Sequence, residues 1–223
     1  MSISLILPVY NEAKNIAACV ENLRTLQGKA EILFADGGSS DETVPILEGA
    51  GFRVLRCPKG RARQMNTAAK EAAGDILFFA HCDSTLPPDA LTAIEAAAAA
   101  GTRFGCFTIA FDYDGPFMGC NTFFSNRRAR KGIAFGDQGM FFDRSLFEEM
   151  GGFPEIPIME DYEFSRQMKG IPICQLPGRI ITSGRRYEKK CPLITMWQMF
   201  YLRCRYRMGM DVEEISRRYR DIR

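Results

Sequence analysis

The sequence predicts an α/β fold: a mostly parallel central sheet flanked by helices, followed by a C-terminal helical appendage. Over residues 3–100, short apolar runs alternate with amphipathic stretches, and this alternation is typical of a parallel sheet. Polar residues follow directly on three of the apolar runs. The chain has 223 residues, which fits one domain of this kind with a short addition.

Periodicity defines the elements of the first half. We predict strands over four apolar runs, at residues 3–8, 31–35, 52–56 and 76–80. Ile16, Val20 and Leu23 have helical spacing and predict a helix over 12–26. Further helices are expected over 41–47, over 61–73 and after Pro87.

The second half has a less regular pattern. Strands are expected over 106–111 and 139–142, and helices over 117–130 and 162–169. From Cys191 onward the chain becomes basic and aromatic. We therefore predict one domain over residues 1–190 and a basic, amphipathic helical tail over residues 191–223.

The tail is expected to contain a helix over 192–208. One of its faces carries Leu193, Met196, Trp197, Phe200 and Cys204, while Arg203, Arg205 and Arg207 crowd one end. Such a helix packs on a core, forms a homodimer or lies peripherally on a membrane. The pattern alone leaves these three outcomes open.

Charge is unevenly distributed along the chain. The net charge is +2, yet residues 179–223 hold twelve basic and five acidic side chains, against seventeen basic and twenty-two acidic in the remainder. This asymmetry indicates a phosphate-bearing partner, an anionic membrane surface or simply a solvated basic helix. The acidic body disfavours nucleic-acid binding, and the lack of GxGxxG after the first strand disfavours an NAD enzyme.

Cysteine usage and the N-terminus bear on localisation. The eight cysteines are scattered without a CxxC pair, which disfavours a structural zinc site and predicts small, mostly buried thiols in a reducing compartment. The apolar start lacks a basic region typical of signal peptides, and no apolar run is long enough to span a membrane. We expect a cytoplasmic protein, with a peripheral position at the inner membrane face if the tail binds lipid.

Polar residues at three predicted strand ends indicate a binding crevice. Tyr10, Asn11 and Glu12 follow the first strand, Asp36 ends the second, and residues 81–83 follow the fourth. Ligands of open α/β sheets bind at the carboxyl ends of the strands. These side chains are therefore expected to lie near one another.

Five segments in order resemble the family 2 glycosyltransferases of GT-A fold. They are LPVYNEAKNI at 7–16, FADGGSSDET at 34–43, HCDS at 81–84, GDQGMFFDRSLFEEMGGFPE at 136–155 and IMEDYEFSRQMKG at 158–170. The resemblance spans residues 3–173 and implies a nucleotide-sugar donor. GRARQMN at 60–66, HCDS and TSGRRYEKK at 182–190 further resemble a radical-SAM/selenodomain-associated subgroup linked to arsenosugar biosynthesis.

The resemblance assigns the donor site. It places Pro8, Tyr10 and Glu12 in the first nucleotide-binding loop, although Glu12 could instead cap the following helix, and it makes Asp36 the residue that recognises the nucleotide. Three further pairs of residues are expected to contact the donor. Arg61 and Arg63 would bind phosphates, Gln64 and Asn66 would bind a base edge, and Arg185 and Arg186 would bind the diphosphate. Arginines at a helix start oppose the helix dipole unless an anion binds there.

His81-Cys82-Asp83 occupies the position of the DxD motif, whose carboxylates bind Mn²⁺ or Mg²⁺ in the resembled family. Asp83 keeps the last position, while His81 replaces the first aspartate. An imidazole ligand suits Mn²⁺ better than Mg²⁺. The alternative is that His81 bonds a phosphate group.

Glu160-Asp161 resembles the ED motif and implies an inverting transfer with Asp161 as the base. Glu160 is expected to orient Asp161 or bind the acceptor; alternatively, the pair is an acidic helix start favoured by the dipole. Asp137 and Gln138 are expected to bond sugar hydroxyls, or to form a simple turn. A QxxRW motif is absent, so no polymer synthesis is expected.

The sequence thus predicts a metal-assisted transfer of a sugar to a hydroxyl of a small-molecule or lipid-linked acceptor. Two alternatives remain open. A sugar nucleotidyltransferase shares a similar core, but segment 7–16 lacks the glycines its phosphate loop needs. A non-catalytic nucleotide-sugar-binding partner is the second, motivated by the altered DxD motif.

Overall fold

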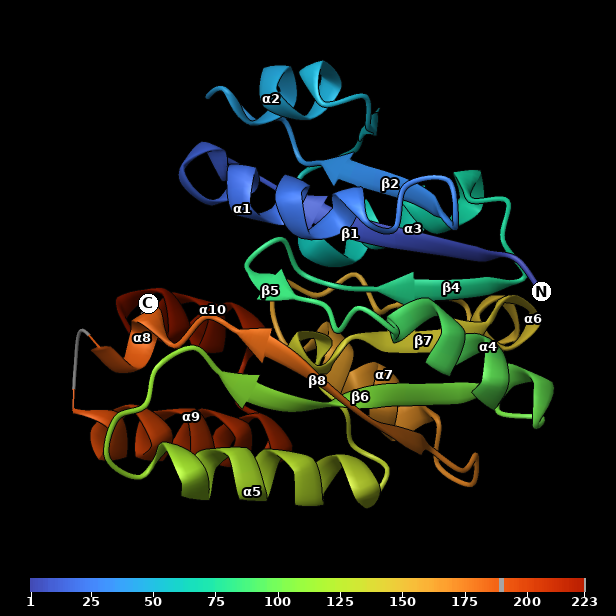
Figure 1. Cartoon of the computed structure of the whole chain (residues 1–223). Coiled ribbons are helices and arrows are strands. Elements are labelled where there is room, and N and C mark those ends of the chain that lie inside the picture. The colour runs from blue at the N-terminus through green and yellow to red at the C-terminus, as the bar shows by residue number, and fades with distance from the viewer. Residues whose placement is uncertain (189–190, 223) are drawn as a thin grey trace.

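A computed structural model describes residues 1–188 and 191–222, except for the side chains of Arg186 and residues 220–222. Its core is an eight-stranded sheet in the order β3-β2-β1-β4-β7-β6-β8-β5 (Figure 1). The strands are β1 (Ile3–Val9), β2 (Glu31–Asp36), β3 (Arg53–Arg56), β4 (Ile76–Phe79), β5 (Ser84–Thr85), β6 (Phe104–Phe111), β7 (Met140–Asp143) and β8 (Cys174–Thr182).

Helices cover both faces of this sheet. They are α1 (Ala13–Arg24), α2 (Thr43–Gly49), α3 (Arg61–Glu71), α4 (Ala90–Ala99), α5 (Met118–Arg130), α6 (Arg144–Glu149), α7 (Glu160–Gln167), α8 (Arg185–Glu188), α9 (Pro192–Arg207) and α10 (Val212–Ile222), with a 3₁₀ turn η1 at Gly136–Gln138. The predicted α/β fold is confirmed. The strands β5 and β8 and the helices α6 and α10 were not predicted.

The sheet is parallel in its first half and mixed in its second. β3, β2, β1 and β4 pair in parallel, as predicted for a strand–helix alternation. β7 lies antiparallel between β4 and β6, and β8 then pairs in parallel with β6. The parallel half brings the ends of β1, β2 and β4 to one edge, where the predicted site residues are found.

Strand residues alternate between two cores, one on each face. Leu5 and Phe78 face the side covered by α1, α2 and α4, whereas Ile6 and Phe79 face the side covered by α3, α6 and α7. β4 is buried along its whole length, as its uninterrupted apolar run predicted. Burial on both faces fixes the register of the strands that carry the site.

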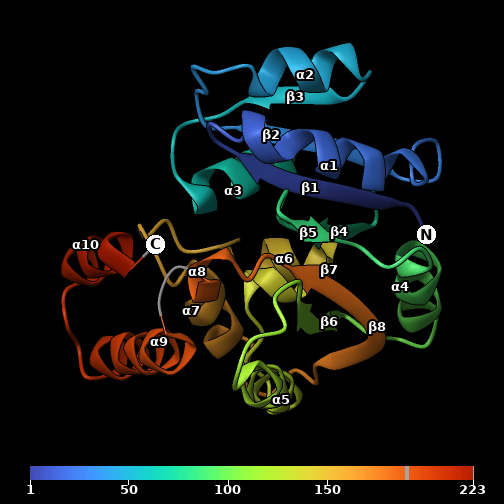
Figure 2. The ribbon, with the colours of Figure 1, turned by 60° about the vertical axis from the view of Figure 1, so that its left-hand side comes forward.

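The C-terminal helices form a hairpin against the segment that precedes α7 (Figure 2). Leu202 of α9 and Ile215 of α10 pack with Ile158 in a small third core. Leu202 and Thr195 are the buried residues of α9, so most of the predicted apolar face is not packed within the chain. None of the described helices combines the length and hydrophobicity that crossing a bilayer requires.

Candidate active site

The carboxyl ends of β1 and β2 are joined by the side chain of Gln64 from α3. Its amide nitrogen donates to the backbone oxygens of Val9, at 2.8 Å, and Ala35, at 2.7 Å. The side chain is buried, so it satisfies two carbonyl groups that water would otherwise have to reach. Gly37 passes over this amide, where a Cβ atom would lie 2.9 Å from Cδ of Gln64. Gln64 therefore braces the two strand ends, and its amide nitrogen is not free for the predicted contact with a base.

Asp36 ends β2 and is 0% exposed. Its carboxylate accepts hydrogen bonds from the backbone N–H groups of Gly38, at 3.2 Å, and Ser39, at 3.0 Å. The Arg56 guanidinium, which sequence reasoning did not identify, donates to it at 3.0 Å. Because Asp36 has no exposed surface, a ligand can contact it only if a neighbouring group such as Arg56 moves.

The loop after β1 remains accessible. Tyr10 is exposed, and the Lys59 ammonium lies 3.9 Å above its ring, whereas Pro8 is buried in β1. Asn11 adopts φ 53°, in the left-handed region, which asparagine tolerates better than most residues other than glycine. Its side-chain oxygen accepts from the N–H of Ser40 at 2.9 Å, which ties this loop to the turn after β2.

Glu12 is the residue before α1, as the capping alternative requires. Its carboxylate does not cap the helix backbone. It accepts a hydrogen bond at 2.8 Å from the side-chain nitrogen of Asn15, one turn along. Its half-buried position still borders the accessible loop around Tyr10.

Arg63 and Asn66 on α3 hold a neighbouring segment. Arg63 forms an exposed ion pair with Glu155 at 3.1 Å. The Asn66 amide donates to the backbone oxygen of Phe153 at 2.8 Å and accepts from its nitrogen at 2.9 Å. The structure thus gives Asn66 a bracing role, away from the predicted contact with a base.

Arg61, at the first position of α3, forms an ion pair with Glu160 at the first position of α7. Glu160 is 1% exposed, and burial raises its pKa while the guanidinium opposes this shift. Burial also lowers the pKa of Arg61, but the charges of Glu160 and Asp161 outweigh it and raise that pKa. Glu160 therefore lies behind the accessible surface, where it can position Arg61.

Asp161 is held by backbone groups on both of its oxygens. Oδ2 accepts from the N–H of Gly136 at 2.8 Å, and Oδ1 accepts from the N–H of Tyr162 at 2.7 Å. Met159, just before the pair, adopts φ 68° in the left-handed region. Each carboxylate oxygen has two lone pairs, so Asp161 can still accept a further hydrogen bond.

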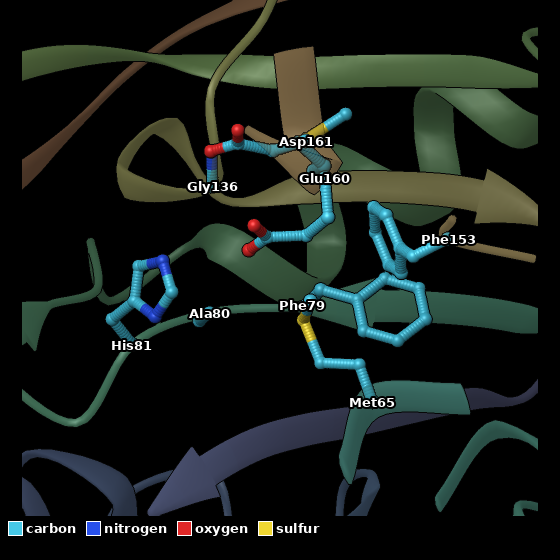
Figure 3. A pocket seen from close by; sticks show the side chains of 9 residues that line it. Met65, Phe79, Ala80, His81, Gly136, Phe153, Glu160 and Asp161 are labelled. Atoms are coloured by element: carbon cyan, nitrogen blue, oxygen red, sulfur yellow. The ribbon is translucent and has the colours of Figure 1, made fainter. Parts of the chain in front are cut away.

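His81 approaches the same turn from the end of β4. A Cβ atom on Gly136 would lie 2.6 Å from Nε2 of His81 and 3.4 Å from Oδ2 of Asp161. Only glycine at this position lets the imidazole and the carboxylate come so close. His81, Glu160 and Asp161 line one small cavity with apolar walls from Met65 and Phe79 (Figure 3).

The predicted sugar-binding residues of η1 differ in exposure. Gln138 is 0% exposed, and its side-chain oxygen accepts from Arg128 at 3.0 Å and from the N–H of Phe135 at 3.4 Å. It therefore supports the turn from within. Asp137 is half-buried in the same turn.

Asp83 and Arg185 form an ion pair at 3.3 Å between the segment after β4 and α8. Two predicted functional residues, one for metal and one for diphosphate, are thus adjacent. Arg186 is the other residue predicted to bind the diphosphate, and its side chain lies outside the described residues. Arg185 is 45% exposed, so it can move toward a phosphate when Asp83 takes another partner.

The donor set fits a metal that is shared with a substrate. Among the described residues there is no group of three or more His, Cys, Asp or Glu side chains able to hold an ion. Mg²⁺ is commonly bound by one or two carboxylates together with substrate phosphates. Asp83, at 31% exposure, can supply one such carboxylate. The imidazole Nε2 of His81 is directed toward Gly136, which leaves its predicted place in the metal site unsupported by this geometry.

Two arginines beside the Phe135 ring were not recognised as site residues from the sequence. The Arg128 guanidinium of α5 lies 3.6 Å from the centre of the Phe135 ring, and that of Arg203 on α9 lies 5.7 Å from it. Burial lowers the pKa of both guanidinium groups. They come from helices distant in sequence, so no local motif could reveal them.

The chain matches the family described as Glycosyl transferase family 2 over residues 4–151. It therefore belongs to this family of glycosyltransferases, and the enzyme class predicted from the motifs is confirmed. An uncharacterized glycosyltransferase of Mycobacterium tuberculosis is 29% identical to it over 180 residues, or 73% of this chain and 67% of that protein. The subgroup suggested by residues 60–66 is not identified by this match.

Solved structures confirm the GT-A fold. S. aureus TarS 1–349 in complex with UDP-GlcNAc superimposes with a TM-score of 0.66 and 19% identity, over 82% of this chain and 58% of that one. The mannosyltransferase PcManGT from Pyrobaculum calidifontis, in complex with GDP-Man and Mn²⁺, gives 0.65 and 21%, over 90% and 60%. This chain spans less than two thirds of either structure.

Proposed function

We propose that the protein is an inverting glycosyltransferase that moves a sugar from a nucleotide-sugar donor to a hydroxyl group of an acceptor. The observation that carries this proposal is the placement of Asp161. It stands at the start of α7 with both oxygens oriented by backbone N–H groups, beside the strand end that bears His81 and Asp83. The nucleotide-sugar complexes of the structural neighbours support the donor class.

In this proposal Asp161 takes the proton of the acceptor hydroxyl as that oxygen attacks the anomeric carbon. General-base catalysis of this kind contributes about 10²–10⁴-fold. The hydrogen bonds from Gly136 and Tyr162 fix the carboxylate before the acceptor arrives. Glu160 positions Arg61, and Asp137 is the residue of η1 proposed to bond a sugar hydroxyl.

The donor is proposed to lie over the ends of β1 and β2. Tyr10 provides an exposed ring for the base, Glu12 borders the same loop, and Asp36 receives the ribose or base once Arg56 has moved. Arg185 is the described arginine best placed for the diphosphate, and Arg186 remains a prediction beside it. Arg63 is exposed and can turn to a phosphate only by leaving Glu155.

A divalent ion, Mn²⁺ or Mg²⁺, is proposed to be held by Asp83 and oxygens of the donor diphosphate. The other predicted ligand, His81, would have to turn its Nε2 away from Gly136 to join it. When bound, such an ion neutralises the charge that develops on the departing diphosphate. Asp83 would exchange Arg185 for the ion, which frees that guanidinium for the same diphosphate.

The first test is a thermal-stability panel of nucleoside diphosphates and nucleotide sugars with Mn²⁺, Mg²⁺ or chelator. A bound ligand stabilises the folded state by mass action. We expect one nucleotide class to raise the melting temperature, and Asp83→Ala to remove the metal-dependent part of the shift. A shift of the same size with and without metal would contradict the proposed ion but remain consistent with a glycosyltransferase. Absence of any shift would favour the non-catalytic partner instead, and release of pyrophosphate from a nucleoside triphosphate would favour a nucleotidyltransferase.

The second test addresses the base. Asp161→Asn keeps one acceptor oxygen for the turn, so we expect nucleotide binding to persist. Release of nucleoside diphosphate from the donor, assayed with a panel of hydroxyl acceptors, is expected to fall about a thousandfold. Unchanged turnover in a folded Asp161→Asn variant would show that another group takes the proton.

The acceptor is proposed to be a small molecule or a lipid-linked hydroxyl compound. A cytoplasmic position, the arsenosugar-type subgroup, the domain boundary at 190/191 and a homodimer or membrane contact through the C-terminal helix remain predictions. The contact through the C-terminal helix concerns the exposed surface of α9.

A further inference from the structure

Large apolar side chains are exposed mainly on two helices. Of the eleven that are exposed among the described residues, seven lie on α9 or on and just before α5. These are Phe117, Phe123, Phe124, Leu193, Ile194, Trp197 and Phe200, exposed by between 46% and 64%. Soluble monomers rarely expose so many large apolar side chains together unless the surface binds something.

The two helices form one surface. Figures 1 and 2 both show α5 and α9 side by side on the same side of the sheet. Arg128 of α5 and Arg203 of α9 share the Phe135 ring between them. On α9, Leu193, Trp197 and Phe200 line a shallow apolar groove, and the Trp197 ring stacks on Tyr201 at 5.5 Å.

The charged side chains of the two helices themselves have one sign. α5 and α9 contain six arginines and no aspartate or glutamate. The arginines are Arg127, Arg128, Arg130, Arg203, Arg205 and Arg207. Arg127, Arg130 and Arg207 are exposed, whereas Arg128 donates inward to Gln138, and Arg203 and Arg205 are half-buried. The arginines follow the aromatic residues along both helices, so the exposed ones border the apolar area.

We propose that α5 and α9 together dock the protein on an anionic lipid bilayer. Aromatic side chains would enter the interfacial region, and the exposed arginines would contact lipid phosphates. No described helix can span a bilayer, so the contact is interfacial. Of the outcomes predicted for the C-terminal helix, this proposal selects membrane contact, and it adds α5 to the contact surface. It does not depend on the proposed glycosyl transfer.

A second copy of the chain fits this surface less well. Most homodimers are two-fold symmetric, so the same surface would face itself. The exposed arginines of one copy would then meet those of the other without a carboxylate from either helix. An anionic bilayer supplies the opposite charge and an apolar interior at once.

The test is flotation of the full chain with vesicles of equimolar phosphatidylglycerol and phosphatidylcholine, and with phosphatidylcholine alone. We expect binding to the anionic vesicles, weakened by salt, and at least about tenfold weaker binding to the neutral ones. The double variant Phe124→Ser/Trp197→Ser should lose about tenfold or more in vesicle affinity. The matched control is Ile181→Ser, an exposed apolar residue of β8, which should bind as the wild type does.

Nucleotide-induced thermal stabilisation serves as the folding check, and it should be the same in all variants. Equal binding of the wild type and the double variant would overturn the proposal. So would a concentration-dependent dimer in sedimentation velocity that the double variant abolishes while vesicles bind neither protein. Failure of nucleotide binding with intact vesicle binding would instead refute the donor site alone.

Discussion

Two buried carboxylates, one in each half of the sheet, are compensated in different ways. Asp36 at the end of β2 has two backbone N–H donors from its own turn in addition to the Arg56 guanidinium. Glu160 at the start of α7 has the Arg61 guanidinium as its side-chain partner, and the two residues are 99 positions apart. The first carboxylate is satisfied locally, whereas the second depends on the packing of α3 against α7.

This difference predicts different sensitivity to mutation. Losing one of several donors leaves a buried charge partly solvated by the remaining ones. Losing the one guanidinium leaves a buried charge unpaired, which costs several kilocalories per mole. The nucleotide side of the site should therefore tolerate loss of its arginine better than the side that carries Glu160 and Asp161.

The largest expected effect comes from Arg61→Ala compared with Arg56→Ala. We expect Arg61→Ala to lower the free energy of unfolding by about 3 kcal/mol, and Arg56→Ala by about 1 kcal/mol, in urea titrations. Arg63→Ala, which removes an exposed ion pair, is the control and should cost under about 1 kcal/mol. Equal losses for Arg61→Ala and Arg56→Ala would show that the local donors around Asp36 are unimportant.

The pH dependence of Arg61→Ala sharpens this comparison. Burial raises the folded-state pKa of Glu160, and the variant removes the group that opposes the shift. A carboxyl with a raised folded-state pKa costs nothing below its unfolded pKa, and destabilises the fold as pH rises through the folded-state value. The destabilisation should therefore be smaller at pH 5 than at pH 8; an equal loss at both would contradict the assigned cause.

The next effect tests the brace in the first half. Gln64→Ala leaves the carbonyl groups of Val9 and Ala35 without their shared donor. We expect a loss of about 2 kcal/mol in unfolding free energy and weaker nucleotide binding, because both strand ends become mobile. Gln27→Ala, whose exposed amide contacts one carbonyl at 3.4 Å, should have almost no effect. A fully stable Gln64→Ala variant would refute the brace.

The smallest effect concerns a helix start next to the second half of the sheet. Asp143 caps α6 by accepting from the N–H of Leu146, whereas Asp89 before α4 makes no side-chain cap. Asp143→Ala should cost about 1 kcal/mol and Asp89→Ala almost nothing in thermal melts. Although burial opposes it, hydrogen bonding lowers the pKa of Asp143, so its contribution should be lost as pH falls from the ordinary aspartate range through that lowered pKa. A loss that persists undiminished in acid would point to packing instead of the cap.

The two halves also differ in what the sequence could predict. Buried parallel strands leave uninterrupted apolar runs, so β1, β2 and β4 were located to within a residue or two. β8 contains Pro177 and Gly178 and pairs irregularly beside Phe107 and Thr108, which hides its pattern. Strand ends carried the polar residues of the site as expected. Their pairing could not be foreseen, because Arg185 and Asp83 are 102 positions apart and meet only when the sheet forms.

The position of β7 has a consequence for how the chain folds during synthesis. β4 pairs with β1 on one side, but its other neighbour, β7, follows only after residues 80–139. Until that stretch has left the ribosome, the apolar segment Ile76–Phe79 has an unpaired edge. Such edges invite pairing with other chains. We expect nascent chains that stop before residue 140 to need chaperone protection, and chains that include β7 to be released as soluble, protease-resistant protein.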